Sequence, residues 1–487
     1  MNGSHPLVII GGGPAGITAA IEAARAGLNP TLIDEASALG GQVYRHLPEE
    51  FQVEDAEALG HDFARGNRLR QEFFDVAGRV EVVSNTAVLG VWPNGDLLWS
   101  RDNSSGVLEA ERLIIASGAY DRPVPFPGWT LPGVMAAGGV QTILKTMRVR
   151  PGRRALVAGT GPLILSVAAR LHHAGVEIAC VLEAGNPPWR DGVFPNEWPH
   201  VEFIDDMRGH LDYLRRANIA IRTNHTVLEA HGPDEVDGAS IGAVDPQTWR
   251  PLKDSFERID VDLIVIGFGF VPNTELTELA GCRHHYAPEL GGWVPARTPF
   301  METSIPGIFA AGDGAGIGGV FVAMEEGRLA GITAAEQAGA IAPDEAERRR
   351  RGPLERLGEF AEMRAVLAEV SQIRPGLLDL ATAGTLVCRC EEVALSDVQT
   401  ALDQGARDLQ AVKLITRLGM GPCQGRNCAP HVGMHLCHAT GRTHEQVGRI
   451  NPRPPLKPVT FGALAAMEGV SETSAVDPLD AVGGGAS

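Results

Sequence analysis

The feature that most constrains this 487-residue chain is a supersecondary unit that occurs twice. In each copy a short apolar run leads into a glycine-rich turn, a helical stretch follows, and a second apolar run ends in a carboxylate. The turns have the sequences GGGPAG at 11–16 and GTGPLI at 159–164. This order of elements is typical of parallel sheets that bind a nucleotide at their carboxyl edge. The repeat therefore predicts an α/β protein with two dinucleotide-binding, Rossmann-like domains.

The first copy carries the complete G-x-G-x-x-G pattern as Gly11, Gly13 and Gly16. The first glycine permits the turn, the second lets a pyrophosphate approach the backbone, and the third allows close packing of the helix. The helix N-terminus then supplies N–H donors to the phosphates. Glu35 follows at the spacing of a ribose-binding carboxylate. Asp34 is adjacent, and strand alternation lets only one of the two point at the ligand.

The second copy departs from the pattern, because Ile164 stands where the third glycine belongs. Gly159, Gly161 and Glu183 still match the two other glycines and the ribose carboxylate. Two interpretations stay open: a bound NAD(P)H that donates hydride, or a retained fold whose site is empty or holds a mononucleotide. An occupant would be an adenine nucleotide, NAD or ATP. No arginine cluster follows Glu183, which disfavours NADP.

The cysteines are concentrated near the C-terminus in two close pairs. Of seven, Cys388 and Cys390 form C-x-C, and Cys423 and Cys428 form C-x4-C. Four thiolates in two pairs predict a metal site. Zinc prefers knuckles with two to four intervening residues, whereas a [2Fe–2S] cluster also takes four cysteines. The remaining Cys180, Cys282 and Cys437 belong to no such pair.

The composition excludes several classes of protein. The net charge of −18 argues against nucleic-acid binding. No apolar run is long enough for a transmembrane span, and the N-terminus lacks a secretory signal, so we expect a cytoplasmic protein.

Three further segments resemble the FAD-binding motifs of two-dinucleotide-domain flavoproteins, the pyridine nucleotide-disulphide reductase type: LGGQVYR at 39–45, LIIASGAYDRPVPFPG at 113–128 and IPGIFAAGDGAGIGG at 305–319. The resemblance implies FAD at the first site, with Asp313 near the flavin's phosphate and ribityl region. No cysteine pair follows Gly41, which disfavours disulphide reduction. The residues expected to bind FAD are Gly11, Gly13, Pro14, Ala15, Gly16, Glu35, Gly41, Gln42, Ala116, Ser117, Gly118, Gly312 and Asp313.

The cysteine segments VCRCEEV and GMGPCQGRNC resemble the domain of bacterioferritin-associated ferredoxin, in which the second pair is spaced more tightly. This resemblance favours a [2Fe–2S] cluster over zinc. We expect an FAD domain at 1–120 and 286–345 and a second nucleotide domain at 121–285. A helical linker at 346–381, a small helical [2Fe–2S] domain at 382–450 and an extended tail at 451–487 complete the prediction.

The whole arrangement, to about Pro458, is similar to the alpha subunits of heteromeric opine oxidases, hydroxyproline dehydrogenases and hydrogen cyanide synthase. The resemblance implies a partner beta subunit, an amino-acid-oxidase-like flavoprotein that oxidises the amine or imino acid. It also implies electron relay through this chain to a quinone-type acceptor, in peripheral contact with the respiratory chain, and allows a small ferredoxin-like third subunit. It does not identify the substrate.

No catalytic residue is predicted on this chain, because no general base is evident in the sequence. Two other functions stay open. One is a self-contained reductase that takes hydride from NADH and passes electrons to its own cluster. The other is an assembly subunit without active cofactors.

Overall fold

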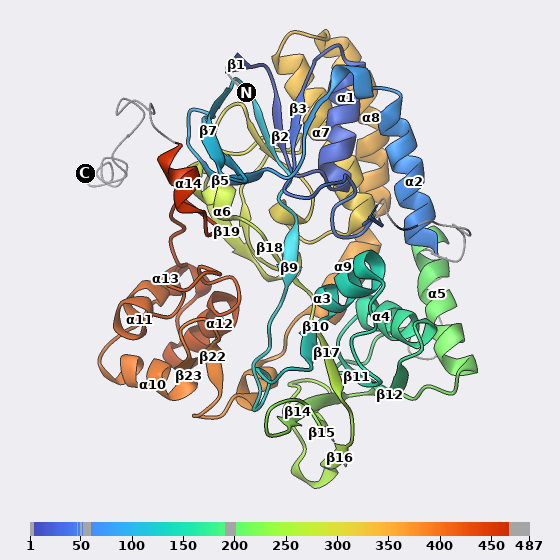
Figure 1. Ribbon diagram of the computed structural model, residues 1–487, viewed down its shortest axis with the longest axis vertical. Coiled ribbons are helices and arrows are strands. Elements are labelled where there is room, and N and C mark those ends of the chain that lie inside the picture. The colour runs from blue at the N-terminus through green and yellow to red at the C-terminus, as the bar shows by residue number, and fades with distance from the viewer. Residues whose placement is uncertain (1–3, 46, 49–50, 52–59, 190–200, 467–487) are drawn as a thin grey trace.

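The computed structural model describes residues 4–45, 47–48, 51, 60–189 and 201–466. Two parallel five-stranded sheets dominate it, with helices on their faces and a helical module beside them (Figure 1). The predicted α/β fold with two Rossmann-like units is confirmed. The charged stretch at 53–70 has helical spacing, and it falls partly outside the described residues.

Four of the five strands of the first sheet are short apolar runs buried on both faces, as is typical of parallel sheets, and the edge strand is largely exposed. The first glycine turn connects its central strand to α1 (Pro14–Arg25). The strand order is β21 (Ile308–Ala310), β8 (Leu113–Ile115), β2 (Val8–Ile10), β3 (Thr31–Ile33) and β4 (Glu81–Val83).

The second sheet repeats this connectivity around the second glycine turn, which leads into α4 (Pro162–His173). Its central strand pairs in parallel with the strand that follows α4, as in the first sheet. The order is β10 (Val134–Ala136), β17 (Leu263–Gly267), β11 (Arg154–Gly159), β12 (Glu177–Glu183) and β13 (Ile221–Thr223).

Smaller sheets complete the two units. One joins β1 (Ser4–His5), β7 (Ser104–Ala110), β6 (Leu97–Arg101) and β5 (Ala87–Val91). Another joins β14 (His225–His231), β15 (Gly238–Ala243) and β16 (Glu257–Ile259). Two antiparallel pairs are β9 (Ala119–Asp121) with β18 (Phe270–Pro272), and β19 (His284–Ala287) with β20 (Gly292–Pro295).

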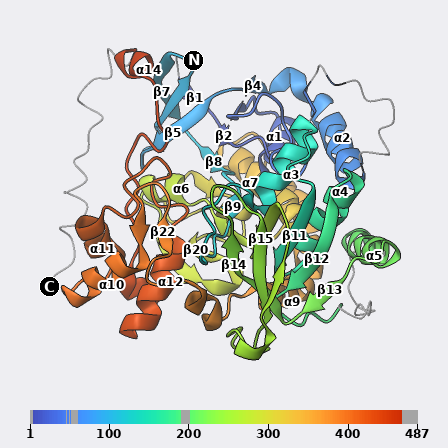
Figure 2. The same cartoon turned by 60° about the horizontal axis from the view of Figure 1, so that its bottom comes forward.

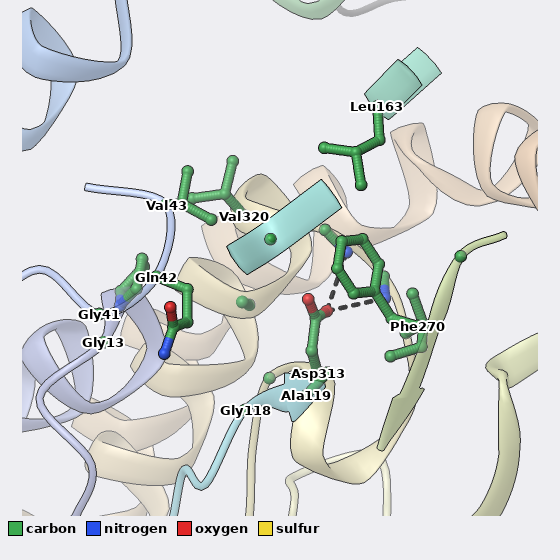
Figure 3. A pocket seen from close by; sticks show the side chains of 18 of the residues that line it. Gly13, Gly41, Gln42, Val43, Gly118, Ala119, Leu163, Phe270, Asp313 and Val320 are labelled. Carbon is green, nitrogen blue, oxygen red and sulfur yellow. Dashed lines mark hydrogen bonds between the residues drawn. The ribbon is translucent and has the colours of Figure 1, made fainter. Parts of the chain in front are cut away.

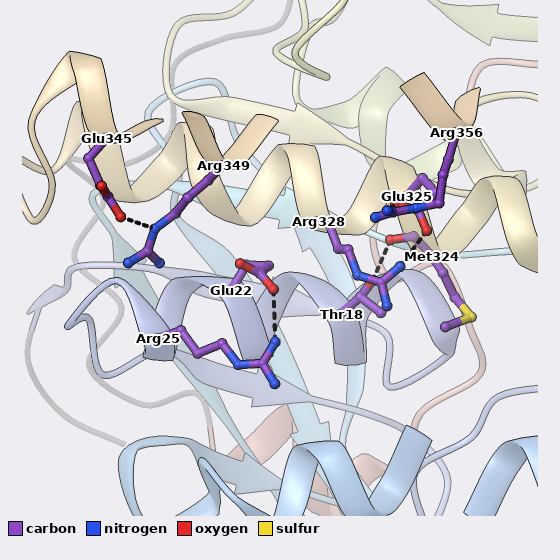
Figure 4. Close-up of polar contacts among 9 residues, drawn as sticks. All are labelled: Thr18, Glu22, Arg25, Met324, Glu325, Arg328, Glu345, Arg349 and Arg356. Atoms are coloured by element: carbon purple, nitrogen blue, oxygen red, sulfur yellow. Dashed lines mark hydrogen bonds and ion pairs between the residues drawn. The ribbon is translucent and has the colours of Figure 1, made fainter. Parts of the chain in front are cut away.

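Two long helices cover the first sheet together with α1. α7 (Val320–Gln337) packs so closely on α1 that a Cβ at Gly331 would lie 2.4 Å from the carbonyl oxygen of Ala19. The Thr18 hydroxyl donates to the Met324 carbonyl at 2.8 Å, and Arg356 of α8 (Pro343–Glu359) pairs with Glu325 at 2.7 Å (Figure 4). The segment expected to be a linker is therefore packed against the first unit. It continues as α9 (Ala361–Ser371), towards the second unit.

Four further helices flank the two sheets: α2 (His61–Phe74), α3 (Ala137–Thr142), α5 (Val201–Arg216) and α6 (Glu275–Leu279).

The cysteine-rich module forms a small body with its own apolar core. Figure 2 shows α10, α11 and α12 on the side of the molecule away from α4 and α5. Its elements are β22 (Leu386–Cys388), β23 (Val393–Ala394), α10 (Leu395–Asp403), α11 (Leu409–Thr416), α12 (Ala429–Thr440) and α13 (His444–Val447). The chain then returns to the first unit and ends, within the described part, at α14 (Phe461–Ala465) beside β7 (Figure 1). Across the described ranges, no helix combines the length and the apolar character that a membrane crossing demands.

Candidate dinucleotide site and cysteine centre

The residues predicted for the first site surround a cavity of about 1970 Å³ at the carboxyl edge of the first sheet. This volume exceeds the ~300–1,000 Å³ of ordinary small-molecule pockets, so it has room for an extended dinucleotide. Gly13, Gly41 and Gln42 lie on one side of it, and Asp313 and Phe270 on the other (Figure 3). The predicted residues that line the cavity are Gly11, Gly13, Pro14, Ala15, Glu35, Gly41, Gln42, Ala116, Ser117, Gly118, Gly312 and Asp313.

The remaining predicted glycine, Gly16, lies buried beneath the loop rather than at the cavity wall. A Cβ there would lie 1.8 Å from the carbonyl oxygen of Gly11, so only glycine allows this approach of helix to strand. Gly13 differs, because a Cβ on it would meet only the Cα of Gly41, at 3.8 Å. Its open face leaves space for a diphosphate at the N-terminus of α1.

Two adjacent carboxylates stand at the far end of this loop. Asp34 accepts hydrogen bonds from the backbone N–H of Gly12 and, at 2.6 Å, of Ala36, while Glu35 pairs with Lys457. Burial raises the pKa of Asp34, against these hydrogen bonds. Both side chains line the cavity. The spacing in the sequence favoured Glu35, whereas the structure places Asp34 on the glycine loop; the alternation at the strand end was the available signal.

At the other end of the cavity, Asp313 is half-buried. Its Oδ1 accepts hydrogen bonds from the N–H groups of Gly318 and Gly319, each at 3.0 Å (Figure 3). Burial raises the pKa of Asp313, and the two hydrogen bonds oppose that shift. Gly318 and Gly319 precede α7, so this carboxylate fixes the loop that closes the flavin end of the predicted site.

The second glycine loop is arranged differently. Thr160 and Pro162 of this loop line the cavity, but none of Gly159, Gly161 and Glu183 is among the described residues that do. The two carboxylate oxygens of Glu183 accept from the N–H of Gly161 at 2.8 Å and of Gly185 at 2.9 Å. Burial raises the pKa of Glu183 to about 7, against the hydrogen bonds from Gly185 and Gly161. As placed, this carboxylate binds its own loop.

The C-terminal end of α9 covers the outer side of that second loop. The Thr160 hydroxyl donates to the Val370 carbonyl at 2.9 Å. A Cβ at Gly161 would lie 3.2 Å from the Ser371 hydroxyl oxygen. Residues 370–371 therefore lie against this loop, and Ser371 lines the cavity together with Thr160 and Pro162 of the loop. No pattern in the sequence indicates this cover, since α9 lies some two hundred residues downstream of the loop.

The four clustered cysteines meet as two pairs. Cys388 lies beside Cys428 and Cys390 beside Cys423, close enough for the thiols of each pair to affect each other's pKa. The Cys428 thiol, together with the N–H groups of Gly419, Glu391 and Cys390, lowers the pKa of Cys388 to about 5 despite burial. As these side chains stand, the described residues include no group of three or more His, Cys, Asp or Glu that could hold a metal ion. Cys390 is exposed, whereas Cys388 and Cys428 are buried.

The remaining cysteines are separate from this centre. Cys180 and Cys282 are buried, and burial raises the pKa of each thiol.

The cysteine module forms part of the cavity wall. Arg426, between Cys423 and Cys428, pairs with Glu275 of the first unit at 2.7 Å. The rings of Tyr286 and His444 stack with centroids 3.6 Å apart. The side chains that line the cavity at this boundary are Tyr286, Arg426, Met434 and His444.

This arrangement fits FAD. The open face of Gly13, the carboxylates at the ribose end and the extension of the cavity past Gly41 to Phe270 match the parts of that molecule. FAD, when bound, supplies hydride acceptance in two-electron steps and release of electrons one at a time.

Comparison with known proteins agrees with this assignment. The sequence model of the pyridine nucleotide-disulphide oxidoreductase family matches residues 5–339, and that of the sarcosine oxidase A3 domain matches 383–468. Hydrogen cyanide synthase subunit HcnB of Pseudomonas aeruginosa is 39% identical over 94% of this chain and 97% of that protein. The A subunit of the opine oxidase of Rhizobium meliloti is 34% identical over 94% of this chain and 98% of that protein.

Among solved structures, L-proline dehydrogenase from P. horikoshii has the same fold, with a TM-score of 0.67 at 22% identity over 95% of this chain and 79% of that one. Fold and site thus define a flavin-dependent oxidoreductase. The chain belongs to the pyridine nucleotide-disulphide oxidoreductase family and, within it, to the oxidase and synthase subunits that include HcnB and the A subunit of opine oxidase. The predicted family is confirmed, and these relatives, named as subunits, imply partner chains for this one.

Proposed function

We propose that this chain is the electron-transfer subunit of a heteromeric dehydrogenase or oxidase. A partner of the amino-acid-oxidase type would oxidise an opine, a D-hydroxyproline or proline, or a related amino or imino acid. Electrons would then pass through FAD and a [2Fe–2S] cluster of this chain to a quinone-type acceptor. The residues proposed to bind FAD are the predicted ones that line the cavity, given above, with Gly16 beneath them.

One observation carries this proposal: a single cavity is lined both by the FAD-site residues and by the cysteine module. Arg426 lines the cavity and stands two residues before Cys428 and three after Cys423. FAD and the cluster would therefore border the same cavity. A flavin handles two electrons and a [2Fe–2S] cluster carries one, so the pair suits conversion of a two-electron oxidation into single-electron transfer.

The cysteine arrangement supports a dinuclear cluster. Two irons of a [2Fe–2S] centre are each held by two thiolates, which corresponds to the two pairs, Cys388 with Cys428 and Cys390 with Cys423. The backbone N–H groups of Gly419 and Glu391 point at Cys388, and such donors tune the potential of a cluster. The C-x-C spacing is also poor for zinc.

The side chains at the cavity support oxidation of the substrate elsewhere. Asp62, which lines the cavity, pairs with Lys145 at 3.0 Å and Arg170 at 2.6 Å. Although burial opposes ionisation, these cations lower the pKa of Asp62. A carboxylate held in its ionised form by two cations is a weak acceptor for a substrate proton. The cover on the second glycine loop likewise disfavours NADH as the electron source.

The proposal is tested with the chain co-purified with its candidate partner. Under anaerobic conditions, a matching imino acid or opine should bleach the flavin and produce the EPR signal of a reduced cluster, and only when the partner is present. Reduction of the isolated chain by the same substrates would contradict the proposal.

The cluster has its own test. Cys423→Ser should abolish the iron content and EPR signal while FAD remains bound. Cys437→Ser is the matched control, because Cys437 lies in the same module outside the two pairs. Unchanged iron in Cys423→Ser would contradict the cluster assignment.

A further inference from the structure

The chain returns from the cysteine module to the first sheet along residues 454–457, which we call the C-terminal strap. The Leu456 N–H donates to the Leu89 carbonyl at 2.9 Å. The Leu456 side chain is buried in the core beneath the first sheet, with Val83 and Val88. Figure 1 shows the wider path, from α13 up to α14 beside β7. The strap is therefore an ordered part of the first unit rather than a free tail.

The strap reaches the end of the cavity where the dinucleotide's adenosine would lie. Lys457 pairs with Glu35, and Leu456, Lys457 and Glu35 all line the cavity. Burial raises the pKa of the neighbouring Asp34, and the positive charge of Lys457 opposes that shift. Asp34 in turn accepts a hydrogen bond from the glycine loop. An ammonium group can donate three hydrogen bonds, so Lys457 keeps donors for ribose hydroxyls after pairing with Glu35.

The strap is held in place by the cysteine loop. The Gln424 side chain donates to the Pro455 carbonyl at 2.8 Å, and Arg426 donates to the Leu456 carbonyl at 3.4 Å. Both residues lie between Cys423 and Cys428. The segment that carries the cysteines thus touches, through two side chains, the segment that borders the adenosine end of the cavity.

We propose that the C-terminal strap closes the adenosine end of the FAD site, with Lys457 as a ligand for the adenosine ribose and with Gln424 of the cysteine loop holding the strap in place. This inference rests on the proposed function, which places FAD in this cavity. It adds to the Rossmann motif a binding residue that lies more than four hundred positions downstream of the glycine loop.

The test measures dinucleotide affinity in the full-length chain. Lys457→Met keeps the length of the side chain and removes its charge, and Lys253→Met, at an exposed position of the second unit, is the matched control. We expect Lys457→Met to weaken FAD binding by about tenfold, the loss of one charge-assisted hydrogen bond at a partly exposed site. Lys253→Met should bind FAD as the wild type does.

ADP, as a competitor, identifies the end of FAD that Lys457 binds. Its affinity should fall by the same factor in Lys457→Met. Gln424→Asn, which shortens the side chain at a backbone φ of 49° that asparagine tolerates, should also weaken FAD and ADP binding, by a few-fold, while the iron content stays constant.

Equal FAD affinity in Lys457→Met and the wild type would overturn the inference and leave the proposed function intact. Weaker FAD binding with unchanged ADP binding would also overturn it, because Lys457 would then act away from the adenosine. A wild-type chain that binds no FAD would overturn both the inference and the proposed function.

Discussion

The two glycine loops begin the same supersecondary unit and both border the large cavity, yet Gly11 and Gly13 of the first line it directly, whereas the second loop is packed against residues 370–371. In the first unit Gly16 lets the Gly11 carbonyl pack directly on α1. In the second, Ile164 is fully buried, and a Cβ on Gly159 or Gly267 would lie 2.8 or 2.9 Å from its Cγ2. The strand glycines Gly159 and Gly267 leave room for the Ile164 side chain on the helix, so the second unit keeps its fold without the third glycine.

The carboxylates differ in the same way. Asp34 accepts from the first loop and still lines the cavity, with Glu35 and Lys457 beside it. Glu183 is fully buried, and both of its oxygens are used by backbone N–H groups of its own loop. A carboxylate at the ribose position can therefore serve the loop instead of a ligand. A match to the sequence pattern alone does not separate the two roles.

The largest effect is expected from giving the first loop the residue of the second. Gly16→Ile should lower the free energy of unfolding by more than about 4 kcal/mol, because its Cβ would lie 1.8 Å from the Gly11 oxygen. Gly78→Ile is the control, since a Cβ on that exposed glycine would have nothing within 4 Å. Denaturant midpoints measure both. A stable Gly16→Ile protein with bound FAD would remove the distinction between the loops.

Glu183→Gln tests whether the second carboxylate is structural. Burial raises the pKa of Glu183 from 4.5 to about 7, so the folded protein holds this proton more tightly than the unfolded chain does. The contribution of Glu183 to stability is therefore complete below pH 4.5 and is lost as the pH rises to about 7. Relative to Glu183→Gln, the wild type should lose up to about 3 kcal/mol over this range. A constant difference between the two unfolding curves would contradict this role.

Gly13→Val separates ligand binding from folding at the first loop. The added side chain meets only the Gly41 Cα, at 3.8 Å, and otherwise enters the space assigned to the diphosphate. FAD affinity should fall about a hundredfold, or about 2.7 kcal/mol, with little change in the unfolding midpoint of the apoprotein. Gly13→Ala should show a smaller loss. Normal FAD occupancy of Gly13→Val would refute the assigned position of the diphosphate.

The smallest effect concerns the cover on the second loop. Thr160→Val removes the hydrogen bond to the Val370 carbonyl and should cost about 1 kcal/mol. Thr18→Val, which removes the bond from α1 to the Met324 carbonyl, should cost about the same in the first unit. Thermal unfolding of the two variants side by side makes the comparison. An unchanged midpoint for Thr160→Val would mean that this contact does not hold α9 in place.

Much of this architecture follows from local sequence pattern. Buried apolar runs, glycine turns and helical spacing predicted the repeated unit, and the first-site residues do gather around one cavity. Long-range contacts could not be predicted in this way. The cover by Ser371 and the strap at Lys457 depend on tertiary packing of segments far from the loops they touch. Asp34 and Glu35 both line the cavity, and spacing alone favoured Glu35 although Asp34 is the one that accepts from the glycine loop.

The most direct test of electron relay through this chain is an anaerobic spectral titration of the isolated chain with NADH. Glu183 bonded to its own loop, and residues 370–371 packed against that loop, predict that FAD and the cluster stay oxidised at every NADH concentration, while dithionite reduces both. Bleaching of the flavin by stoichiometric NADH would contradict the relay role, because it would make the chain a self-contained reductase rather than one that depends on its partner.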